Sequence, residues 1–102
     1  MSFVELKEEI QFNEFVKGTG VIQFSAAWCG PCKRLKPTLT SACKERNLPL
    51  LYVDVDEFSD LADKYRVQKL PTVMIVKTSR ELVRFEGGNL EPIVCKMDEL
   101  LK

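Results

Sequence analysis

Three short, strongly apolar runs alternate with segments of helical periodicity, and this alternation restricts the available folds more than any other feature of the chain. The runs cover residues 21–26, 49–55 and 71–76, and we interpret each one as a buried strand. Helices are predicted around them for residues 10–16, 29–46, 59–65 and 90–101. Strands that alternate with helices form parallel pairs covered by helices on both faces, so the sequence predicts an α/β fold.

Two weaker strand candidates complete the expected sheet. Residues 3–6 are the first strand, and residues 81–85 alternate polar and apolar side chains as the hairpin partner of residues 71–76. The expected order is therefore β-α-β-α-β-α-β-β-α. Because a hairpin is antiparallel, we expect a mixed central sheet flanked by helices on both faces, in one domain that spans residues 1–102.

Particular residues mark where the helices begin, bend and end. Gly18 and Gly20 are expected to end the first helix. Ser59 and Asn89 are expected to cap the third and fourth helices. Pro37 lies inside the second helix, which it should bend because a proline removes one backbone donor.

Helical spacing also predicts which side chains face the core. The expected core-facing side chains are Ile10, Phe12, Phe15, Val16, Leu35, Leu39, Ala42, Cys43, Leu61, Ala62, Tyr65, Leu90, Ile93, Val94, Met97, Leu100 and Leu101. Cys43 falls among them, so we interpret it as a buried thiol. Cys95 falls on the opposite helix face and is expected to be exposed. An intermolecular disulfide or a glutathione adduct at Cys95 stays open, although an unreactive surface thiol is favoured.

Charge and hydropathy exclude several classes of function. Lys plus Arg and Asp plus Glu both number 15, so the net charge of zero gives no support for nucleic-acid or membrane binding. No apolar stretch approaches the ~18 residues that span a membrane. The N-terminal residues carry neither a basic start nor an apolar run of signal-peptide length. We expect a cytoplasmic monomer in a reducing environment.

Cys29 and Cys32 form a C-x-x-C motif between a predicted buried strand and a predicted helix. Two thiols at this spacing on the first turn of a helix can form a disulfide. The first sulfur lies at the helix N-terminus, where unpaired N–H groups and the helix dipole favour a thiolate. We therefore expect Cys29 to attack a substrate disulfide, and Cys32 to resolve the mixed disulfide by attacking Cys29.

The residues beside the two cysteines support the same chemistry. Gly30 and Pro31 keep the loop between the thiols short, and a proline in the first turn of a helix fixes the backbone there. Trp28 is expected to supply an apolar rim beside the nucleophile.

Other interpretations of the motif are weaker. A structural zinc site needs four ligands, and the sequence has no histidine, so only Cys43, Cys95 or carboxylates could complete it. An inert pair of core thiols is the further alternative. We therefore expect no metal. The side chains of Lys33, Arg34 and Lys36 form a basic cluster, and those of Asp54, Asp56, Glu57 and Asp60 form an acidic cluster; both are interpreted as solvated surface.

The segment Trp28-Cys29-Gly30-Pro31-Cys32-Lys33 resembles the active-site motif of the thioredoxin family, and the similarity extends over the whole chain. Leu70-Pro71-Thr72 is similar to the cis-proline segment of that family, and Gly87-Gly88 to its glycine loop. The resemblance implies a thioredoxin fold with a cis Leu70–Pro71 bond. It also implies that substrates bind along Trp28, Leu70, Pro71, Gly87 and Gly88, with the backbone near Leu70 pairing with an extended peptide.

The same resemblance implies the activity and its partners. It predicts a protein-disulfide reductase and electron carrier that serves cell redox homeostasis. The redox-active Cys29–Cys32 pair would take the place of a bound cofactor. Reducing equivalents would come from an NADPH-dependent thioredoxin reductase, and disulfide-containing proteins would be the clients.

One residue departs from the family pattern. Thioredoxins place a buried aspartate six residues before the first cysteine, beneath the second, and this chain has Gln23 there. A lysine that many bacterial thioredoxins place opposite that aspartate aligns with Tyr52. Because glutamine cannot accept a proton, we expect Cys32 to rely on solvent as the base, with Gln23 and Tyr52 as a neutral hydrogen-bonding pair. A tolerated polar core residue is the alternative for Gln23.

Three other functions stay open beside the reductase. A redox-dependent binding module would hold partners without turnover, and a dedicated electron donor would serve one enzyme, such as a peroxidase or a reductase. An oxidase or isomerase is disfavoured by Gly30-Pro31, because isomerase-type families carry a histidine between the cysteines.

Overall fold

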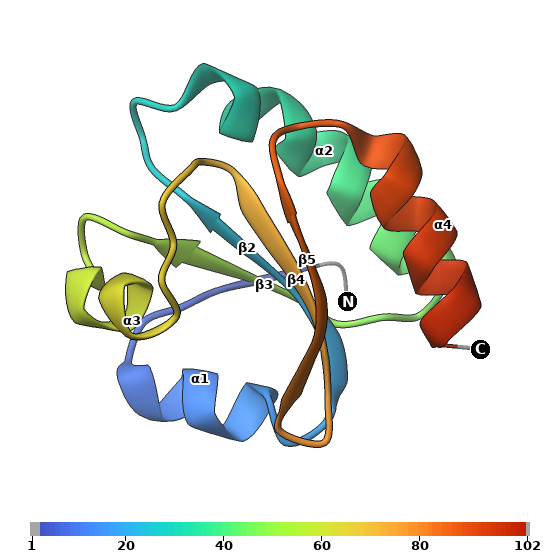
Figure 1. The fold of residues 1–102 in the computed structure, drawn as a ribbon, viewed down its shortest axis with the longest axis horizontal. Coiled ribbons are helices and arrows are strands. Elements are labelled where there is room, and N and C mark those ends of the chain that lie inside the picture. Colours follow the sequence, from blue (N-terminus) through green and yellow to red (C-terminus); the bar gives the residue numbers. More distant parts are fainter. Residues whose placement is uncertain (1–2, 102) are drawn as a thin grey trace.

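The structure, a computed structural model, describes residues 3–101 and places five strands between two pairs of helices (Figure 1). In chain order the elements are β1 (Val4–Glu5), α1 (Glu9–Phe15), β2 (Thr19–Ser25), α2 (Gly30–Glu45), β3 (Leu50–Asp54), α3 (Ser59–Lys64), β4 (Thr72–Lys77), β5 (Arg80–Glu86) and α4 (Leu90–Leu100). This order confirms the predicted succession of strands and helices.

The five strands form one mixed sheet in the order β1-β3-β2-β4-β5. Strand β3 runs parallel to both β1 and β2, while β4 runs antiparallel to β2 and β5. The mixed sheet predicted from the terminal hairpin is confirmed. Strand β2, which leads into the cysteine motif, is paired on both sides, so the backbone that positions the motif is held by two ladders of hydrogen bonds.

Each face of the sheet carries its own hydrophobic core. Helices α2 and α4 cover one face, where residues such as Leu39 and Ile93 pack against Val21 and Val73. Helices α1 and α3 cover the other face, where Phe12 is fully buried among strand residues. The two pairs of helices lie on opposite sides of the sheet in Figure 1. The apolar runs are therefore continuous because both faces of these strands are buried.

The ends of the helices agree only in part with the predicted signals. Asn89 caps α4, with its side-chain oxygen accepting a hydrogen bond from the backbone N–H of Glu91 at 3.3 Å. Ser59 does not cap α3: the cap position belongs to Phe58, and Ser59 is the first helical residue. The prediction for Ser59 was wrong because the hydrogen bond from Phe58 N–H to the Asp54 carbonyl turns the chain one residue earlier.

Two predictions near α1 were also wrong. Ile10 is 60% exposed rather than core-facing, because this seven-residue helix turns only a narrow stripe around Phe12 towards the sheet. Gly20 does not end α1 but lies buried within β2. A Cβ atom at Gly20 would come within 2.6 Å of the Phe15 ring, so the close approach of α1 to β2 requires a glycine there.

Strand β5 lacks the regular alternation predicted for residues 81–85. Glu81 pairs with Val76 and Val83 pairs with Ile75, so Leu82 is an extra residue and β5 carries a β-bulge. Leu82 and Val83 both pack against the α2–α4 core as a result.

Candidate active site

The two cysteines of the motif lie at the N-terminus of α2, where the chain leaves β2. They are joined as a disulfide, with their Cα atoms 5.3 Å apart. Cys29 is the N-cap residue of α2, and its sulfur accepts a hydrogen bond from the backbone N–H of Cys32 at 3.2 Å. The Cys29 sulfur thus lies at the positive end of the helix, an environment that favours the thiolate form of a cysteine.

The local sequence explains why α2 begins at this point. Gly30 and Pro31 are its first two residues, and a proline there costs no helical hydrogen bond. The Cys29 N–H donates to the Ala26 carbonyl at 3.1 Å, which closes the turn after β2. Cys29 and Cys32 are only 5% and 3% exposed, so surrounding residues cover most of the surface of both.

Among residues 3–101, Trp28 is the most exposed large hydrophobic side chain, at 69%. Its indole Nε1 donates to Oδ2 of Asp56 at 2.9 Å, and the Asp56 N–H donates to Oδ1 of Asp54, also at 2.9 Å. Sequence reasoning assigned Asp56 to a solvated acidic cluster and missed this contact. Asp56 therefore orients the tryptophan beside Cys29.

A groove of about 450 Å³ opens beside Cys29. Residues of the active-site loop form one wall, and the opposite wall consists of residues from α3 and from the segment that leads to β4. The lining residues are Trp28, Cys29, Gly30, Pro31, Val55, Ala62, Val67, Gln68 and Leu70. Two residues of the predicted substrate surface, Trp28 and Leu70, thus line the same depression as Cys29.

The other three predicted substrate residues, Pro71, Gly87 and Gly88, are not among the residues that line this groove. The Leu70–Pro71 bond is cis, as predicted from the family resemblance. The N–H of Gly87 donates to the carbonyl of Pro71 at 2.8 Å. A Cβ at Gly88 would lie 3.6 Å from the Pro31 carbonyl oxygen, so the glycine segment borders the active-site loop. The φ angle of +111° at Gly87 is a conformation that favours glycine.

Gln23 lies in β2 beneath the second cysteine and is only 1% exposed. Its Nε2 donates to the backbone carbonyl of Cys32 at 3.3 Å, whereas its Oε1 has no hydrogen-bond partner among the described residues. The amide therefore contacts the backbone of Cys32. An unpaired buried acceptor is costly, so this position is a weak point in the packing under α2.

Tyr52 lies opposite Gln23 in the register of β2 and β3. Its hydroxyl donates to the Lys36 carbonyl at 2.9 Å and lies 2.9 Å from Oγ1 of Thr40. Burial raises the pKa of Tyr52 to about 12, and the hydrogen bond with Thr40 opposes that rise. The predicted hydrogen-bonding pair was wrong: Gln23 and Tyr52 lie side by side, but the hydrogen bonds of each side chain are made to α2 and not to the other.

A second pocket, of about 290 Å³, is lined by Cys32 and shares no lining residue with the groove. Tyr52, Lys33 and Lys36 line it, together with the carboxylates of Glu5, Asp54 and Glu57. Of the predicted basic cluster, Lys33 and Arg34 are exposed, while Lys36 forms an ion pair with Glu5 at 3.2 Å. Cys32 therefore borders a pocket with several charged residues that is separate from the groove.

The remaining cysteines lie where their helix faces predicted. Cys43 is buried and Cys95 is exposed, and both are free thiols. Burial raises the pKa of Cys43 to about 12, against an opposing effect of the nearby Arg46. Cys43 is therefore protonated at neutral pH and does not compete as a nucleophile.

The described residues contain no group of three or more His, Cys, Asp or Glu side chains placed to hold a metal ion. Within the same residues, no helix is both long enough and apolar enough to cross a bilayer.

Comparisons with known proteins agree with the fold and the site. The sequence model of the family described as Thioredoxin matches residues 3–99. Mouse thioredoxin is 36% identical over an alignment of 104 residues, gaps included, and the alignment covers 97% of each chain. Human thioredoxin is 34% identical over 102 residues, which cover 95% of this chain and 97% of its own. The solved thioredoxin from Trypanosoma brucei brucei superposes with a TM-score of 0.91 at 28% identity, covering 98% of this chain and 91% of the other. Mitochondrial thioredoxin 3 from Saccharomyces cerevisiae superposes with a TM-score of 0.87 at 29% identity, covering 97% and 96%.

Proposed function

This chain belongs to the thioredoxin family and is a thiol–disulfide oxidoreductase, and from that premise we propose that it reduces protein disulfides with Cys29 as nucleophile and Cys32 as resolving thiol. The observation that carries this assignment of roles is the hydrogen bond from Cys32 N–H to the Cys29 sulfur at the N-terminus of α2. Cys29 also lines the open groove, whereas Cys32 does not.

The reaction proceeds in two exchanges. The Cys29 thiolate attacks one sulfur of the substrate disulfide, which forms a mixed disulfide and releases the other substrate sulfur as a thiolate. Cys32 then loses its proton and attacks Cys29. The bond between Cys29 and the substrate breaks, the second substrate sulfur leaves as a thiolate, and Cys29–Cys32 becomes a disulfide. The substrate gains two electrons, and the dithiol loses two.

Deprotonation of Cys32 depends on solvent in this protein. Gln23 has no group that accepts a proton at neutral pH, and its amide contacts the Cys32 backbone rather than the thiol. The second pocket supports a role for water as the immediate acceptor, because Cys32 lines it together with Glu5, Asp54 and Glu57.

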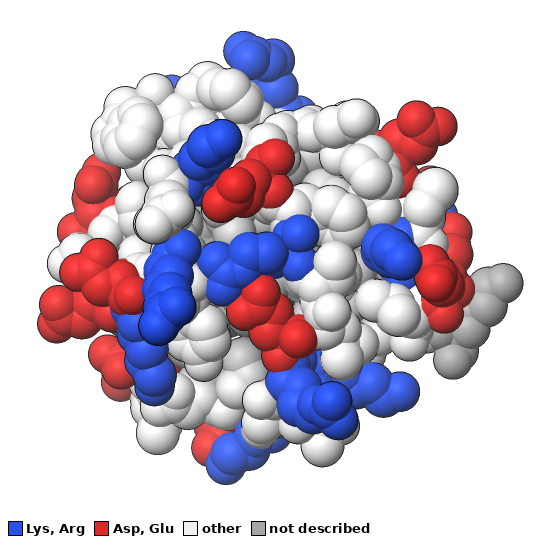
Figure 2. Space-filling view, in the orientation of Figure 1, with Lys and Arg blue, Asp and Glu red and all other residues white. Residues whose placement is uncertain are grey.

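The groove is the proposed binding site for the client chain. Trp28 and Leu70 would contact side chains that flank the substrate cysteine, and Gly87 and Gly88 would leave room for an extended backbone beside Pro71. Charges of both signs are interspersed over the face seen in Figure 2, which supports a broad range of clients rather than one strongly charged partner.

The partners and the compartment follow from the same assignment. Oxidised protein would be reduced by an NADPH-dependent thioredoxin reductase and would act as a monomeric cytoplasmic electron carrier. Cys43 and Cys95 are both free thiols, in addition to the Cys29–Cys32 pair, and this supports a reducing compartment. One similar solved chain belongs to a study of thiol resolution in a yeast mitochondrial 1-Cys peroxiredoxin by glutathione and thioredoxin systems, so a peroxidase is one class of client to test.

Reduction of insulin by dithiothreitol tests the proposed function. Wild-type protein is expected to accelerate precipitation of the insulin chains, and Cys29→Ser is expected to give only the rate of dithiothreitol alone. Retention of the wild-type rate in Cys29→Ser would assign the chemistry to another thiol. No acceleration by folded wild-type protein, together with stable binding of clients, would favour the binding module instead.

A further inference from the structure

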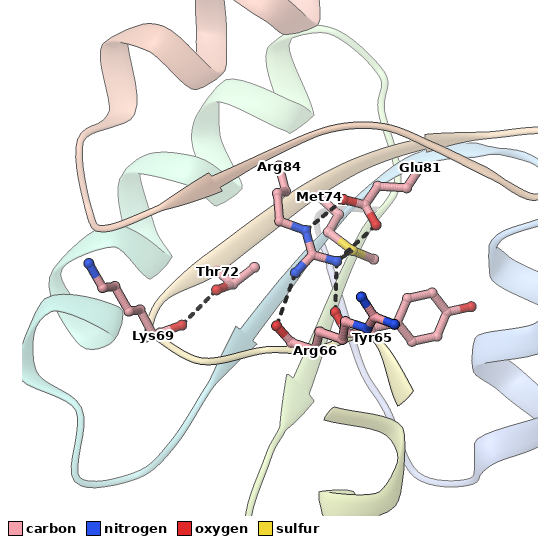
Figure 3. A network of polar contacts seen from close by, with 7 residues as sticks. All are labelled: Tyr65, Arg66, Lys69, Thr72, Met74, Glu81 and Arg84. Atoms are coloured by element: carbon pink, nitrogen blue, oxygen red, sulfur yellow. Dashed lines mark hydrogen bonds and ion pairs between the residues drawn. The ribbon is translucent and has the colours of Figure 1, made fainter. Parts of the chain in front are cut away.

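We infer that Arg84 is a positioning residue that holds the wall of the substrate groove opposite Cys29. The inference rests on the proposed function, because it concerns the groove assigned there to the client chain. Arg84 lies on β5, and its guanidinium bridges that strand to the chain that leaves α3 (Figure 3). The segment it holds continues directly into Val67, Gln68 and Leu70, which line the groove.

The guanidinium is fixed by contacts on two sides. Nε and Nη2 donate to the two carboxylate oxygens of Glu81, at 2.6 and 2.9 Å. Nη2 also donates to the Tyr65 carbonyl at 2.7 Å, and Nη1 lies 3.4 Å from the Arg66 carbonyl. Glu81 thus fixes the plane of the guanidinium group, and the remaining N–H groups of that plane donate to the carbonyls of Tyr65 and Arg66.

The bulge in β5 makes this arrangement possible. Residues three apart on a regular strand point to opposite faces of a sheet. Because Leu82 is an extra residue, Glu81 pairs with Val76 and Arg84 pairs with Met74, and both partners belong to the α1–α3 core. Glu81 and Arg84 therefore share the face on which α3 packs.

The carbonyls that Arg84 binds belong to the end of α3. Helix α3 ends at Lys64, so the carbonyl groups of Tyr65 and Arg66 have no backbone N–H of the same helix to accept from. Arg66 has a φ angle of +56°, a left-handed conformation that is costly for a residue other than glycine. A cation at this end of the helix also complements its dipole. Arg84 thus stabilises the strained turn from which the groove wall departs.

The other end of the segment has its own anchors. Thr72 Oγ1 donates to the Lys69 carbonyl at 2.6 Å, and the Gly87 N–H donates to the Pro71 carbonyl. The groove wall is thus held at residues 65–66 by Arg84 and at residues 69–71 by β4 and the glycine segment. Loss of the first anchor would free the wall on the side of Val67 while leaving Pro71 in place.

Arg46 supplies a matched control. Its side chain is 26% exposed against 27% for Arg84, and it also joins a carboxylate, Asp98, to a carbonyl at the end of a helix, that of Ala42. Arg46 follows the C-terminus of α2, whereas Cys29 lies at the N-terminus of that helix. Arg46→Met therefore removes a similar set of contacts without touching the groove.

The test compares Arg84→Met, Arg46→Met, Glu81→Gln and wild type in three measurements. These are steady-state insulin reduction, the second-order rate of the reduced protein with 5,5′-dithiobis(2-nitrobenzoate), and amide hydrogen exchange at residues 66–70. Arg84→Met is expected to raise KM for insulin at least about fivefold with little change in kcat, within the range that misplaced binding groups cost. Its rate with the small disulfide should stay at the wild-type value, and its loop amides should exchange faster.

The controls separate positioning from general destabilisation. Arg46→Met should keep the wild-type KM, and Glu81→Gln should stay near it because the contacts of Arg84 with Tyr65 and Arg66 remain. An equal rise in KM in Arg46→Met, or unchanged KM and loop exchange in Arg84→Met, would overturn the inference. If wild-type protein itself fails to reduce insulin, the proposed function fails, and the exchange data alone decide whether Arg84 holds the loop.

Discussion

Cys32→Ser protein is expected to accumulate as a covalent adduct with disulfide-containing clients. Cys29 keeps its position at the N-terminus of α2, so it still attacks the substrate, but the serine hydroxyl cannot displace the substrate sulfur. Mixing the variant with insulin should give a mixed disulfide that survives gel filtration and is released by dithiothreitol. Mass spectrometry should place the bond at Cys29, with at least about a tenfold excess over wild type, whose dithiol resolves the intermediate.

The exposed thiol of Cys95 must be excluded from this experiment. Both the trapping variant and its control are therefore made in a Cys95→Ser background, and Cys43 can stay because it is buried. Cys29→Ser in the same background leaves Cys32 as the active-site thiol, which is 3% exposed and lies outside the groove, and it should trap nothing. Adducts of equal yield from Cys29→Ser and Cys32→Ser would contradict the assigned roles.

Gln23→Asp is expected to lower stability at neutral pH and to speed resolution. The aspartate removes the Nε2 donor that serves the Cys32 carbonyl and buries a carboxylate at a site that is 1% exposed. The loss of that hydrogen bond alone costs about 0.5–1.5 kcal/mol, since the Cys32 carbonyl keeps its place in the hydrogen-bond ladder of α2. A loss of about 1 kcal/mol lowers Tm by about 4–8 °C in a domain near this size. Thermal unfolding followed by circular dichroism measures the change, and an unchanged or higher Tm at pH 7 would contradict it.

The pH dependence separates the charge from the shape of the new side chain. Burial raises the pKa of the introduced carboxyl above its unfolded value of about 3.9, so the folded state favours the protonated form. The electrostatic penalty is therefore absent below about pH 3.9 and grows above it until the folded pKa is passed. Gln23→Asn, which shortens the side chain without a charge, should be destabilised by the same amount across this range.

The second half of the prediction concerns rate. The introduced carboxylate lies under Cys32 and can accept its proton, which Gln23 cannot do. Single-turnover release of insulin from the mixed disulfide at pH 7 should be faster in Gln23→Asp than in wild type, and Gln23→Asn should show no gain. Equal rates in all three proteins would mean that solvent already removes the proton without limiting the reaction.

Much of the fold could be predicted because local patterns and tertiary packing agree. The apolar runs are buried on both faces, and the C-x-x-C motif stands at a predicted strand-to-helix junction, which places both thiols at the start of a helix. Cys43 and Cys95 could be assigned to opposite environments from helix faces alone. The wrong predictions concern residues whose burial depends on neighbouring elements. Ile10 has helical spacing, but no other element within residues 3–101 packs against it. Gly20 does not end a helix but lies in β2, where the Phe15 ring leaves little room for a side chain.

The parts of the site that escaped prediction depend on contacts between distant residues. Asp56 orients Trp28 across a separation of 28 residues in the sequence. The sequence does not distinguish Asp56 from the other acidic residues of its cluster, so this contact could not be predicted. The contact of Arg84 with Tyr65 depends on the bulge at Leu82, which no glycine or proline marks. The substitution at Gln23 was visible as a departure, but its bond to the Cys32 carbonyl and the unpaired Oε1 required side-chain geometry.

The reduction potential of the Cys29–Cys32 couple tests the central claim most directly. The protein is equilibrated with defined ratios of reduced and oxidised dithiothreitol, and the fraction oxidised is read from the fluorescence of Trp28, the only tryptophan in the sequence. A protein-disulfide reductase is expected to have a potential near about −270 mV, as thioredoxins do. A value between about −180 and −120 mV, the range of disulfide isomerases and oxidases, would contradict the account.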